Sequence, residues 1–327
     1  MSRGVTVSGV ESAPSFRVAV LVPCYNEEAA IAAVVSDFRR ALPEAIIYVY
    51  DNNSTDRTVE IARAAGAVVR CEPLQGKGNV VRRMFADIEA DIYVLVDGDD
   101  TYDAASAPAL VGGLLSRQLD MVNGARVTGI EAAYRPGHRF GNVLLTSLVA
   151  RIFGNRIGDM LSGYRVLSRR FVKSFPALSS GFEIETELTV HALELQLPVV
   201  EIKTPYKDRP QGSTSKLRTF RDGFRILGTI LRLVKQERPM AFFTTLFAVL
   251  ALASAVMIGP VVATFLDTGL VPRLPTAVLA MGMMLLAFLS LGCGLILETV
   301  TRGRQEMKRL HYLALPALEP PTPADAP

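Results

Sequence analysis

The residues Ile92-Tyr93-Val94-Leu95-Val96-Asp97-Gly98-Asp99-Asp100-Thr101 join an apolar run to three carboxylates. The apolar first half of this stretch predicts a strand that is covered on both faces, as strands of parallel sheets are. Ligands of open α/β sheets bind beyond the carboxyl ends of such strands. Asp97 and Asp99, with Gly98 between them to allow a sharp turn, offer two hard oxygen ligands to one Mg²⁺ or Mn²⁺, which in turn holds the phosphates of a diphosphate-bearing substrate. A solvated acidic turn after a core strand is the alternative.

Strands and helices alternate on both sides of this stretch. The pattern before it predicts a strand, a helix, a strand, a helix and a short strand, at 17–22, 28–42, 45–50, 56–65 and 67–71. The pattern after it predicts a helix at 104–116 and strands at 121–127 and 199–206. Alternation with short links is typical of a doubly wound sheet. We therefore expect an α/β fold with a Rossmann-like, mostly parallel sheet.

The composition narrows the class of protein. Half of the 327 residues are hydrophobic, with the excess towards the C-terminal end, and the net charge is +3. So small a charge, without an arginine-rich arm or a stacked-aromatic motif, argues against a nucleic-acid partner. Cys24, Cys71 and Cys293 form no metal-type spacing, so we expect a reducing compartment. Residues 1–15 lack the apolar run of a signal peptide and are expected to be disordered.

A lysine between two glycines, Gly76-Lys77-Gly78, opens a predicted helix that runs to residue 90. Free backbone N–H groups at a helix N-terminus, together with the Lys77 ammonium, make a suitable site for a phosphate or a nucleobase edge. The loop is not a Walker motif, because the earlier glycine and the Ser or Thr after the lysine are missing. An ordinary capped loop is the alternative.

More polar groups follow the central strand. Arg126 comes after small residues near the end of a predicted strand, where it can lie close to a phosphate, and Arg139 belongs to a polar loop. Asp159, Ser162 and Arg165 crowd a glycine-bearing turn that leads into a basic strand. We interpret this crowding as a second polar site.

The C-terminal third predicts helices at and in a membrane. Residues 215–238 form a basic amphipathic pattern, which is expected to lie in the membrane interface; packing on the domain's own sheet is the alternative. Residues 240–266 and 274–297 carry no charge, and each run exceeds the roughly 20 residues that cross a bilayer. Basic residues precede the first run and follow the second, so the positive-inside rule places both termini in the cytoplasm.

These patterns predict a multi-pass protein of the inner (plasma) membrane with its catalytic domain in the cytoplasm. The proline-rich end at 315–327 is expected to be disordered. The predicted parts are a disordered N-terminus at 1–15, a catalytic domain at 16–214, interfacial amphipathic helices at 215–238, a two-helix transmembrane hairpin at 239–300 and a cytoplasmic tail at 301–327.

Six motifs in order resemble those of inverting family-two glycosyltransferases with a GT-A fold. Within that family they resemble those of the polyisoprenyl-phosphate glycosyltransferases, which include dolichol-phosphate mannose synthases. The motifs span about 17–216, and they are Val22-Pro23-Cys24-Tyr25-Asn26-Glu27-Glu28, Asp51-Asn52-Asn53-Ser54-Thr55-Asp56, Gly76-Lys77-Gly78, Val96-Asp97-Gly98-Asp99, Ser162-Gly163-Tyr164-Arg165 and Gly212-Ser213-Thr214-Ser215-Lys216.

The resemblance implies a role for each matched residue. The nucleotide's base and ribose would meet Pro23, Tyr25, Glu27, Asp51 and Asn53, and Lys77 would help to bind the nucleotide. The acceptor side by the membrane would be lined by Ser162, Arg165, Arg209 and Lys216. The predicted catalytic residues are Asp97 and Asp99, which hold the metal on either side of Gly98, and Arg126, Arg139 and Arg165, which face phosphates.

One residue departs from the family pattern. Mannose synthases carry Gln two residues after the second aspartate, and this chain has Thr101 there. The third metal contact is therefore open between Thr101, Asp100 and water.

The chemistry of the acceptor distinguishes the possible reactions. A phosphate monoester has a second pKa of about 6, so it is mostly a nucleophilic dianion at neutral pH and needs no strong general base. A hydroxyl acceptor needs a base, for which Glu183, Glu185 and Asp159 are candidates. Glu183 and Glu185 also open a predicted helix, where acidic groups simply suit the helix dipole.

We therefore expect transfer of one sugar from a UDP- or GDP-sugar to undecaprenyl or dolichyl phosphate, with inversion. The alternatives are transfer to a hydroxyl of a lipid-linked saccharide or glycerolipid, and a non-catalytic nucleotide-sugar-binding scaffold. A processive polysaccharide synthase is disfavoured, because its relatives use a Gln-x-x-Arg-Trp motif and this chain has no tryptophan. A homo-oligomer is left open.

Overall fold

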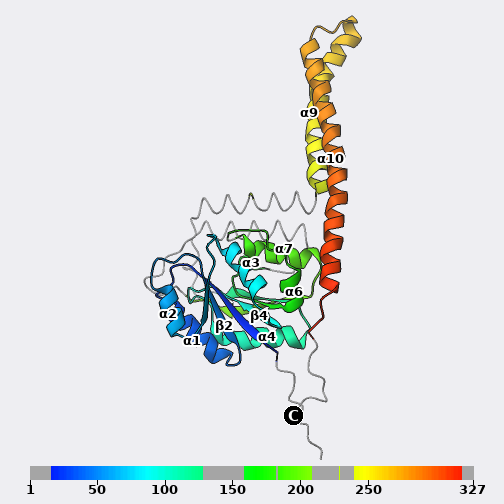
Figure 1. The fold of residues 1–327 in the computed structure, drawn as a ribbon. Helices are drawn as coiled ribbons and strands as arrows, with labels where there is room; N and C mark the ends of the chain where they lie inside the picture. The colour runs from blue at the N-terminus through cyan, green and yellow to red at the C-terminus, as the bar shows by residue number, and fades with distance from the viewer. Residues whose placement is uncertain (1–15, 128–157, 182, 208–227, 229–238, 319–327) are drawn as a thin grey trace, which may run out of the picture. The chain divides into compact units, whose positions relative to one another are not determined.

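The computed structural model describes residues 16–127, 158–181, 183–207, 228 and 239–318. The chain divides into two compact units, Met1–Thr219 with His311–Pro327, and Phe220–Leu310. The first unit contains a sheet with helices on both faces, and the second contains two long apolar helices (Figure 1).

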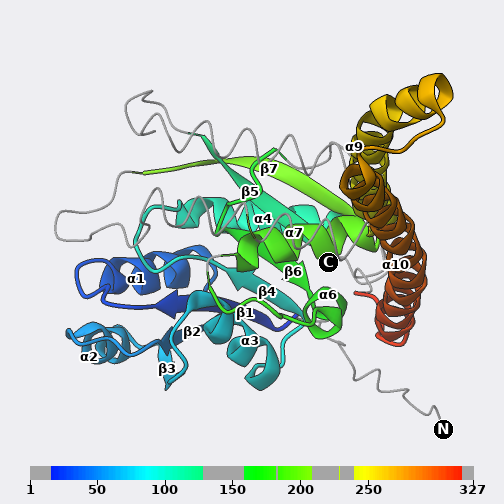
Figure 2. The ribbon, with the colours of Figure 1, turned by 90° about the horizontal axis from the view of Figure 1, so that it is seen from above.

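Seven strands form one sheet in the order β3-β2-β1-β4-β6-β5-β7 (Figure 2). They are β1 (Val18–Cys24), β2 (Ile46–Asp51), β3 (Val68–Cys71), β4 (Ile92–Leu95), β5 (Met121–Val127), β6 (Arg165–Ser168) and β7 (Val199–Pro205). Only β6 runs antiparallel to its neighbours β4 and β5, so the carboxyl ends of the other six strands meet the start of β6 at one edge. The predicted α/β fold with a mostly parallel sheet is confirmed.

Helices cover both faces of this sheet. Those described are α1 (Ile31–Ala41), α2 (Thr58–Ala64), α3 (Lys77–Asp87), the 3₁₀ turn η1 (Ala104–Ser106), α4 (Ala107–Ser116), α6 (Arg169–Ser174) and α7 (Ile184–Glu194). Figure 1 shows α3, α6 and α7 on the opposite face from α1 and α4. The arrangement is that of a doubly wound sheet.

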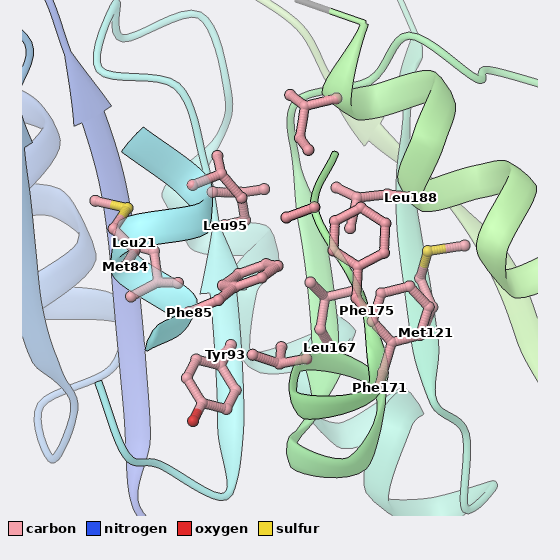
Figure 3. Close-up of a cluster of buried hydrophobic side chains, with 14 of the residues drawn as sticks. Leu21, Met84, Phe85, Tyr93, Leu95, Met121, Leu167, Phe171, Phe175 and Leu188 are labelled. Carbon is pink, nitrogen blue, oxygen red and sulfur yellow. The ribbon is translucent and has the colours of Figure 1, made fainter. Parts of the chain in front are cut away.

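Each face has its own hydrophobic core, because successive residues of a strand point to opposite faces. In β1, Leu21 belongs to the core under α3, α6 and α7, while Val20 and Val22 belong to the core under α1 and α4. Figure 3 shows the first of these cores, in which Met84 of α3 and Leu188 of α7 pack with residues of the sheet. The central strand β4 contributes to both cores, as its uninterrupted apolar sequence predicts.

Two helices begin later than their apolar patterns indicate. The pattern predicts starts at 28 and 56, but α1 begins at Ile31 and α2 at Thr58. The intervening residues bond across the two loops instead: Glu28 N–H donates to Asp56 Oδ2 at 3.2 Å, and Arg57 N–H donates to Glu28 Oε2 at 3.0 Å. These bonds tie the loop after β1 to the loop after β2.

The second unit is a pair of helices, α9 (Pro239–Thr268) and α10 (Leu274–Leu313). Both are long and apolar enough to cross a membrane, and only 11% and 22% of their most apolar windows are buried, which distinguishes them from core helices of a soluble domain. The helices pack on each other through Ser254, whose hydroxyl donates to Ala280 O at 2.7 Å, and through Gly294, which lies against Phe243.

Helix α10 is longer than its apolar run. Its 40 residues amount to about 60 Å at about 1.5 Å per residue, against about 30 Å for the hydrocarbon core of a bilayer. The first part of the predicted tail at 301–327 is therefore helical, up to Leu313.

Candidate active site

The carboxyl-end edge of β1 and β2 carries the residues predicted to form the base and ribose pocket. Asp51 ends β2, is 5% exposed, and accepts the Ser54 N–H at 3.2 Å. Asn26 joins the two loops, because its N–H donates to Ser54 Oγ and its Oδ1 accepts the Thr55 N–H, both at 2.8 Å. Tyr25 is partly exposed beside them.

Pro23, Glu27 and Asn53 lie at the same edge. Pro23 pairs with Tyr50 in the β1–β2 register. Glu27 is buried, and its N–H donates to Thr58 Oγ1 at 2.8 Å. All five residues that the sequence assigned to this pocket are thus brought to one edge of the sheet, next to the start of α1.

Asn52 and Asn53 hold the loop that leads to Lys77. Asn52 donates to Glu72 O at 2.8 Å and accepts the Gly76 N–H at 2.7 Å. Asn53 adopts a positive φ of 67°, which asparagine tolerates, and donates to Pro73 O at 3.0 Å. The Asn53 side chain therefore supports the loop, and Asn52, which the sequence did not single out, does so as well.

The acidic turn after β4 presents two different carboxylates. The Asp97 side chain is 30% exposed, whereas Asp99 is 5% exposed. Thr101 is buried and its Oγ1 donates to Asp99 Oδ1 at 2.6 Å, so the residue that departs from the family pattern orients Asp99. A Cβ on Gly98 would lie 2.6 Å from Cys24 Sγ, which explains the glycine between the aspartates.

Lys77 joins the acidic turn to α7. Its Nζ pairs with Asp97 Oδ1 and with Glu185 Oε1, and the Lys77 and Glu185 side chains are 9% and 6% exposed. Burial alone would lower the pKa of Lys77, but the charges of Asp97 and Glu185 outweigh burial and raise the pKa well above its ordinary value. The ammonium therefore stays protonated.

The N-terminus of α3 is occupied by the protein itself. Gly78 N–H and Asn79 N–H donate to Ser180 O at 3.1 and 3.4 Å. A Cβ on Gly76 or Gly78 would lie 2.2 Å from the carbonyl oxygen of Ser180 or Ser179, respectively. The expectation of free N–H groups here is wrong for residues 78 and 79, because the glycines admit this loop; the capped-loop alternative describes the backbone.

The turn before β6 packs directly on Asp97. A Cβ on Gly163 would lie 2.4 Å from Asp97 Oδ2, and the Gly163 N–H donates to Tyr102 Oη at 2.7 Å. Ser162 is fully buried and its hydroxyl donates to Gly124 O at 2.5 Å. Ser162 therefore has a structural role in place of the predicted acceptor contact. Tyr102, which follows the acidic turn and accepts the Gly163 N–H, is a further residue that the sequence did not reveal.

Arg165 is also placed differently from its prediction. Its side chain is fully buried, with Nε donating to Ser162 O at 3.1 Å and Nη2 donating to Met160 O and Glu185 O at 2.8 Å. Burial lowers the pKa of Arg165 to about 10. Because its donors satisfy buried carbonyl groups, the predicted contact with an acceptor phosphate is wrong, and Arg165 instead ties the turn to α7.

Arg126 pairs with Asp159 next to Tyr206. The guanidinium donates from Nε and Nη2 to Asp159 Oδ2 and Oδ1 at 2.8 and 2.7 Å, and it lies 5.6 Å from the centre of the Tyr206 ring. Burial would raise the pKa of Asp159, but the hydrogen bonds and charge of Arg126 hold it below its usual range. The carboxylate is thereby a poor proton acceptor.

Three predicted site residues, Arg139, Arg209 and Lys216, lie outside the described residues. Of the others, Lys77, Asp97 and Glu185 are in direct contact, and Asp99 follows Asp97 in the same turn. Arg126 and Asp159 form a separate pair at the end of β5.

The donor set at the acidic turn fits a hard divalent cation. Asp97 and Asp99 supply carboxylate oxygens, and the described part of the chain contains no group of three or more His, Cys, Asp or Glu side chains arranged to hold a metal. Mg²⁺ is commonly bound through one or two carboxylates, with substrate phosphates and water completing its shell. Two carboxylates therefore suffice for a metal that arrives with a diphosphate.

Comparison with known proteins identifies related glycosyltransferases. The profile described as "Glycosyl transferase family 2" matches residues 19–175. Protein RfbJ of Shigella flexneri is 60% identical over 126 residues, which is 38% of this chain and 98% of that protein. The dolichyl-phosphate hexose transferase of Haloferax volcanii is 31% identical over 222 residues, covering 67% of this chain and 95% of that protein.

A solved structure has the same fold. Glucosyl-3-phosphoglycerate synthase from Mycobacterium tuberculosis, in complex with Mn²⁺, UDP-glucose and phosphoglyceric acid, superposes with a TM-score of 0.50 and 26% identity, covering 60% of this chain and 73% of that one. The sheet that carries Asp97 and Asp99 is thus a GT-A fold. With relatives matched over nearly their whole length, the chain belongs to glycosyl transferase family 2 and is a glycosyltransferase.

Proposed function

We propose that the protein transfers one hexose from a UDP- or GDP-sugar to the phosphate of a membrane polyprenyl phosphate, with inversion at the anomeric carbon and with Mg²⁺ or Mn²⁺ as cofactor. In this reaction an acceptor phosphate oxygen bonds to the anomeric carbon while the bond from that carbon to the nucleotide diphosphate breaks. The products are a sugar-phosphate lipid and a nucleoside diphosphate.

The donor side of the proposal uses the edge formed by β1, β2 and β4. The loops that carry Tyr25 and Asp51 would hold the base and ribose, and Lys77 would face the diphosphate. Asp97 and Asp99 would hold the metal, which when bound stabilises negative charge on the leaving diphosphate.

The observation that carries the acceptor assignment is the pairing of the carboxylates. Asp159 is engaged by Arg126, and Glu185 by Lys77, so two of the three candidate bases for a hydroxyl acceptor are held in ion pairs. A phosphate acceptor is already a nucleophile and needs no such base. Glu183 is the remaining candidate, and Glu183→Gln would leave transfer to a phosphate within a few-fold of wild type.

The membrane part of the proposal accounts for the apolar hairpin. Helices α9 and α10 would keep the enzyme at the surface where the head group of a polyprenyl phosphate lies, with the catalytic domain at 16–214 and both termini in the cytoplasm. The relative from Haloferax volcanii supports this choice of acceptor, since it is named for dolichyl phosphate.

The test is transfer of radiolabelled sugar by the purified full chain. UDP- and GDP-sugars would be offered in turn with undecaprenyl phosphate and Mn²⁺ or Mg²⁺, and label would be counted in organic-extractable lipid. We expect label that is labile to mild acid and is lost with EDTA or in Asp99→Asn. Label in a saccharide or glycerolipid, but not in the polyprenyl phosphate, would contradict the acceptor assignment.

Substitution of Asp97 and Asp99 also distinguishes an enzyme from a non-catalytic scaffold protein. Asp97→Asn with Asp99→Asn would abolish metal-dependent turnover by an enzyme, whereas a non-catalytic nucleotide-sugar-binding protein would support its pathway unchanged.

A further inference from the structure

One lysine serves two carboxylates at the site. Lys77 Nζ pairs with Asp97, the carboxylate to which we assign the metal, and with Glu185. An ammonium and a divalent cation repel each other at contact distance, most strongly where water is scarce. Metal binding at Asp97 therefore requires the charge of Lys77 to move towards its other partner.

The backbone of Lys77 does not leave the site easily. Gly78 donates its N–H to Ser180 O at 3.1 Å, and its Cα approaches Ser179 so closely that a Cβ would lie 2.2 Å from that carbonyl oxygen. Glu187 in turn accepts the Ser179 N–H at 2.8 Å. The helix start is clamped, so adjustment is confined to the flexible four-carbon side chain of Lys77.

Glu185 is positioned to bind the Lys77 ammonium. Its backbone carbonyl accepts bonds from Arg165 Nη2 at 2.8 Å and Thr189 Oγ1 at 3.1 Å, which holds the first turn of α7 in place. Its Oε1 contacts Lys77, while its buried Oε2 has no hydrogen-bond partner among the described residues. If Asp97 releases the Lys77 ammonium to bind the metal, Glu185 Oε2 is a further acceptor for that ammonium.

We propose that Lys77 is a resident counter-cation of Asp97 that competes with the divalent metal, and that Glu185 is a positioning residue that takes over the ammonium when the metal binds. The inference rests on the proposed function in one respect, the assignment of the metal to Asp97. It follows that metal alone binds weakly, and that a nucleotide diphosphate, which attracts both cations, makes metal binding tighter.

The test measures Mn²⁺ affinity of the purified full chain in detergent, without any sugar transfer, from the electron paramagnetic resonance signal of free Mn²⁺. Without nucleotide, Lys77→Met removes the competing charge and should bind Mn²⁺ about tenfold more tightly than wild type. Glu185→Gln leaves Lys77 with Asp97 as its charged partner and should bind about tenfold more weakly. Addition of UDP should tighten binding more in wild type than in Lys77→Met.

Lys173→Met is the matched control. Lys173 is also a largely buried, paired lysine, but it lies on α6 and contacts the C-terminal end of α3, away from Lys77, donating to Phe85 O at 2.7 Å and pairing with Glu89 at 2.8 Å. Its substitution should leave Mn²⁺ affinity within twofold of wild type, and Asp97→Asn should abolish the binding.

The outcomes separate this inference from the proposed function. Asp97-dependent binding that is unchanged or weakened in Lys77→Met, or unchanged in Glu185→Gln, overturns the competition alone. Binding that survives Asp97→Asn overturns both the competition and the metal assignment. If Lys77→Met does not fold, Glu185→Gln decides the question by itself.

Discussion

At the scale of single residues, several glycines of the site are required by contacts and not by flexibility. Gly98 leaves room for Cys24, and Gly163 leaves room for Asp97. Neither has a positive φ among the backbone angles of the described residues, so any residue could adopt their conformation but none could occupy their space. A methyl group at either position would move a side chain or a turn of the site.

Gly163→Ala is expected to reduce sugar transfer by about 100-fold, because its Cβ would lie 2.4 Å from Asp97 Oδ2 and would displace a proposed metal ligand. Initial rates with saturating donor would measure the loss. Gly112→Ala is the control, since a Cβ there meets nothing within 4 Å and alanine favours a helix by up to about 1 kcal/mol. Equal rates in the two variants would contradict the close contact.

Arg165→Met is expected to destabilise the fold by about 3 kcal/mol, because it removes buried donors from Ser162 O, Met160 O and Glu185 O. The free energy of unfolding in urea would measure it. Arg169→Met, at a side chain that is one-third exposed and pairs with an exposed carboxylate, should change that energy by less than about 1 kcal/mol. If Arg165→Met were fully stable but transferred sugar more slowly, this result would support the original prediction that Arg165 contacts an acceptor phosphate.

Among the secondary-structure elements, α3 and α7 each carry a charged residue in the first turn, and these two residues, of opposite charge, are in contact. Lys77 is the first residue of α3, and Glu185 is the second residue of α7, 108 positions further along the chain. The acidic first turn of α7 suits the helix dipole, as the sequence indicates, but the contact with Lys77 gives Glu185 a second purpose. A local pattern cannot show that contact, since the two residues are 108 positions apart in the sequence.

The helix pair α9 and α10 depends on close approach at Gly294, where a Cβ would lie 2.8 Å from Phe243 Cβ. Gly294→Leu should therefore separate the helices and lower the thermal stability of the hairpin in detergent by several degrees. Gly292→Leu, two residues away with nothing within 4 Å, should not. The same melting temperature for both variants would show that the helices do not pack at this glycine.

At the scale of the whole molecule, the glycosyltransferase domain and the apolar helix pair form separate compact units of one chain. The apolar residues of α9 and α10 are largely exposed, and exposed apolar surface of this extent requires a lipid or protein cover. Lipid is the cover that fits helices of this length.

The full chain is accordingly expected to remain with the membrane fraction after washing with alkaline carbonate, which releases peripheral proteins. Immunoblotting of the pellet and supernatant would measure the distribution. Quantitative release into the supernatant would exclude a membrane-spanning hairpin and would point to a protein partner for α9 and α10.

The order of strands and helices, the acidic turn and the two apolar helices could all be predicted from the amino-acid sequence. These follow from patterns over neighbouring residues: the continuous apolar runs of β1 and β4, the second of which is followed by Asp97, and the long uncharged stretches of α9 and α10. The residues predicted to form the base and ribose pocket also lie at one edge of the sheet, because parallel strands end at the same edge.

Which charged groups share partners became clear only in the folded protein. Ser162 and Arg165 have the composition of a binding motif, yet both are buried and bonded to backbone carbonyls. Lys77 could be explained locally by a capped loop, and Glu185 by the dipole of its own helix. In the folded protein, however, Lys77 pairs with both Asp97 and Glu185. The physical reason is that a polar side chain's role depends on burial and on partners distant in sequence, which strand and helix periodicity do not encode.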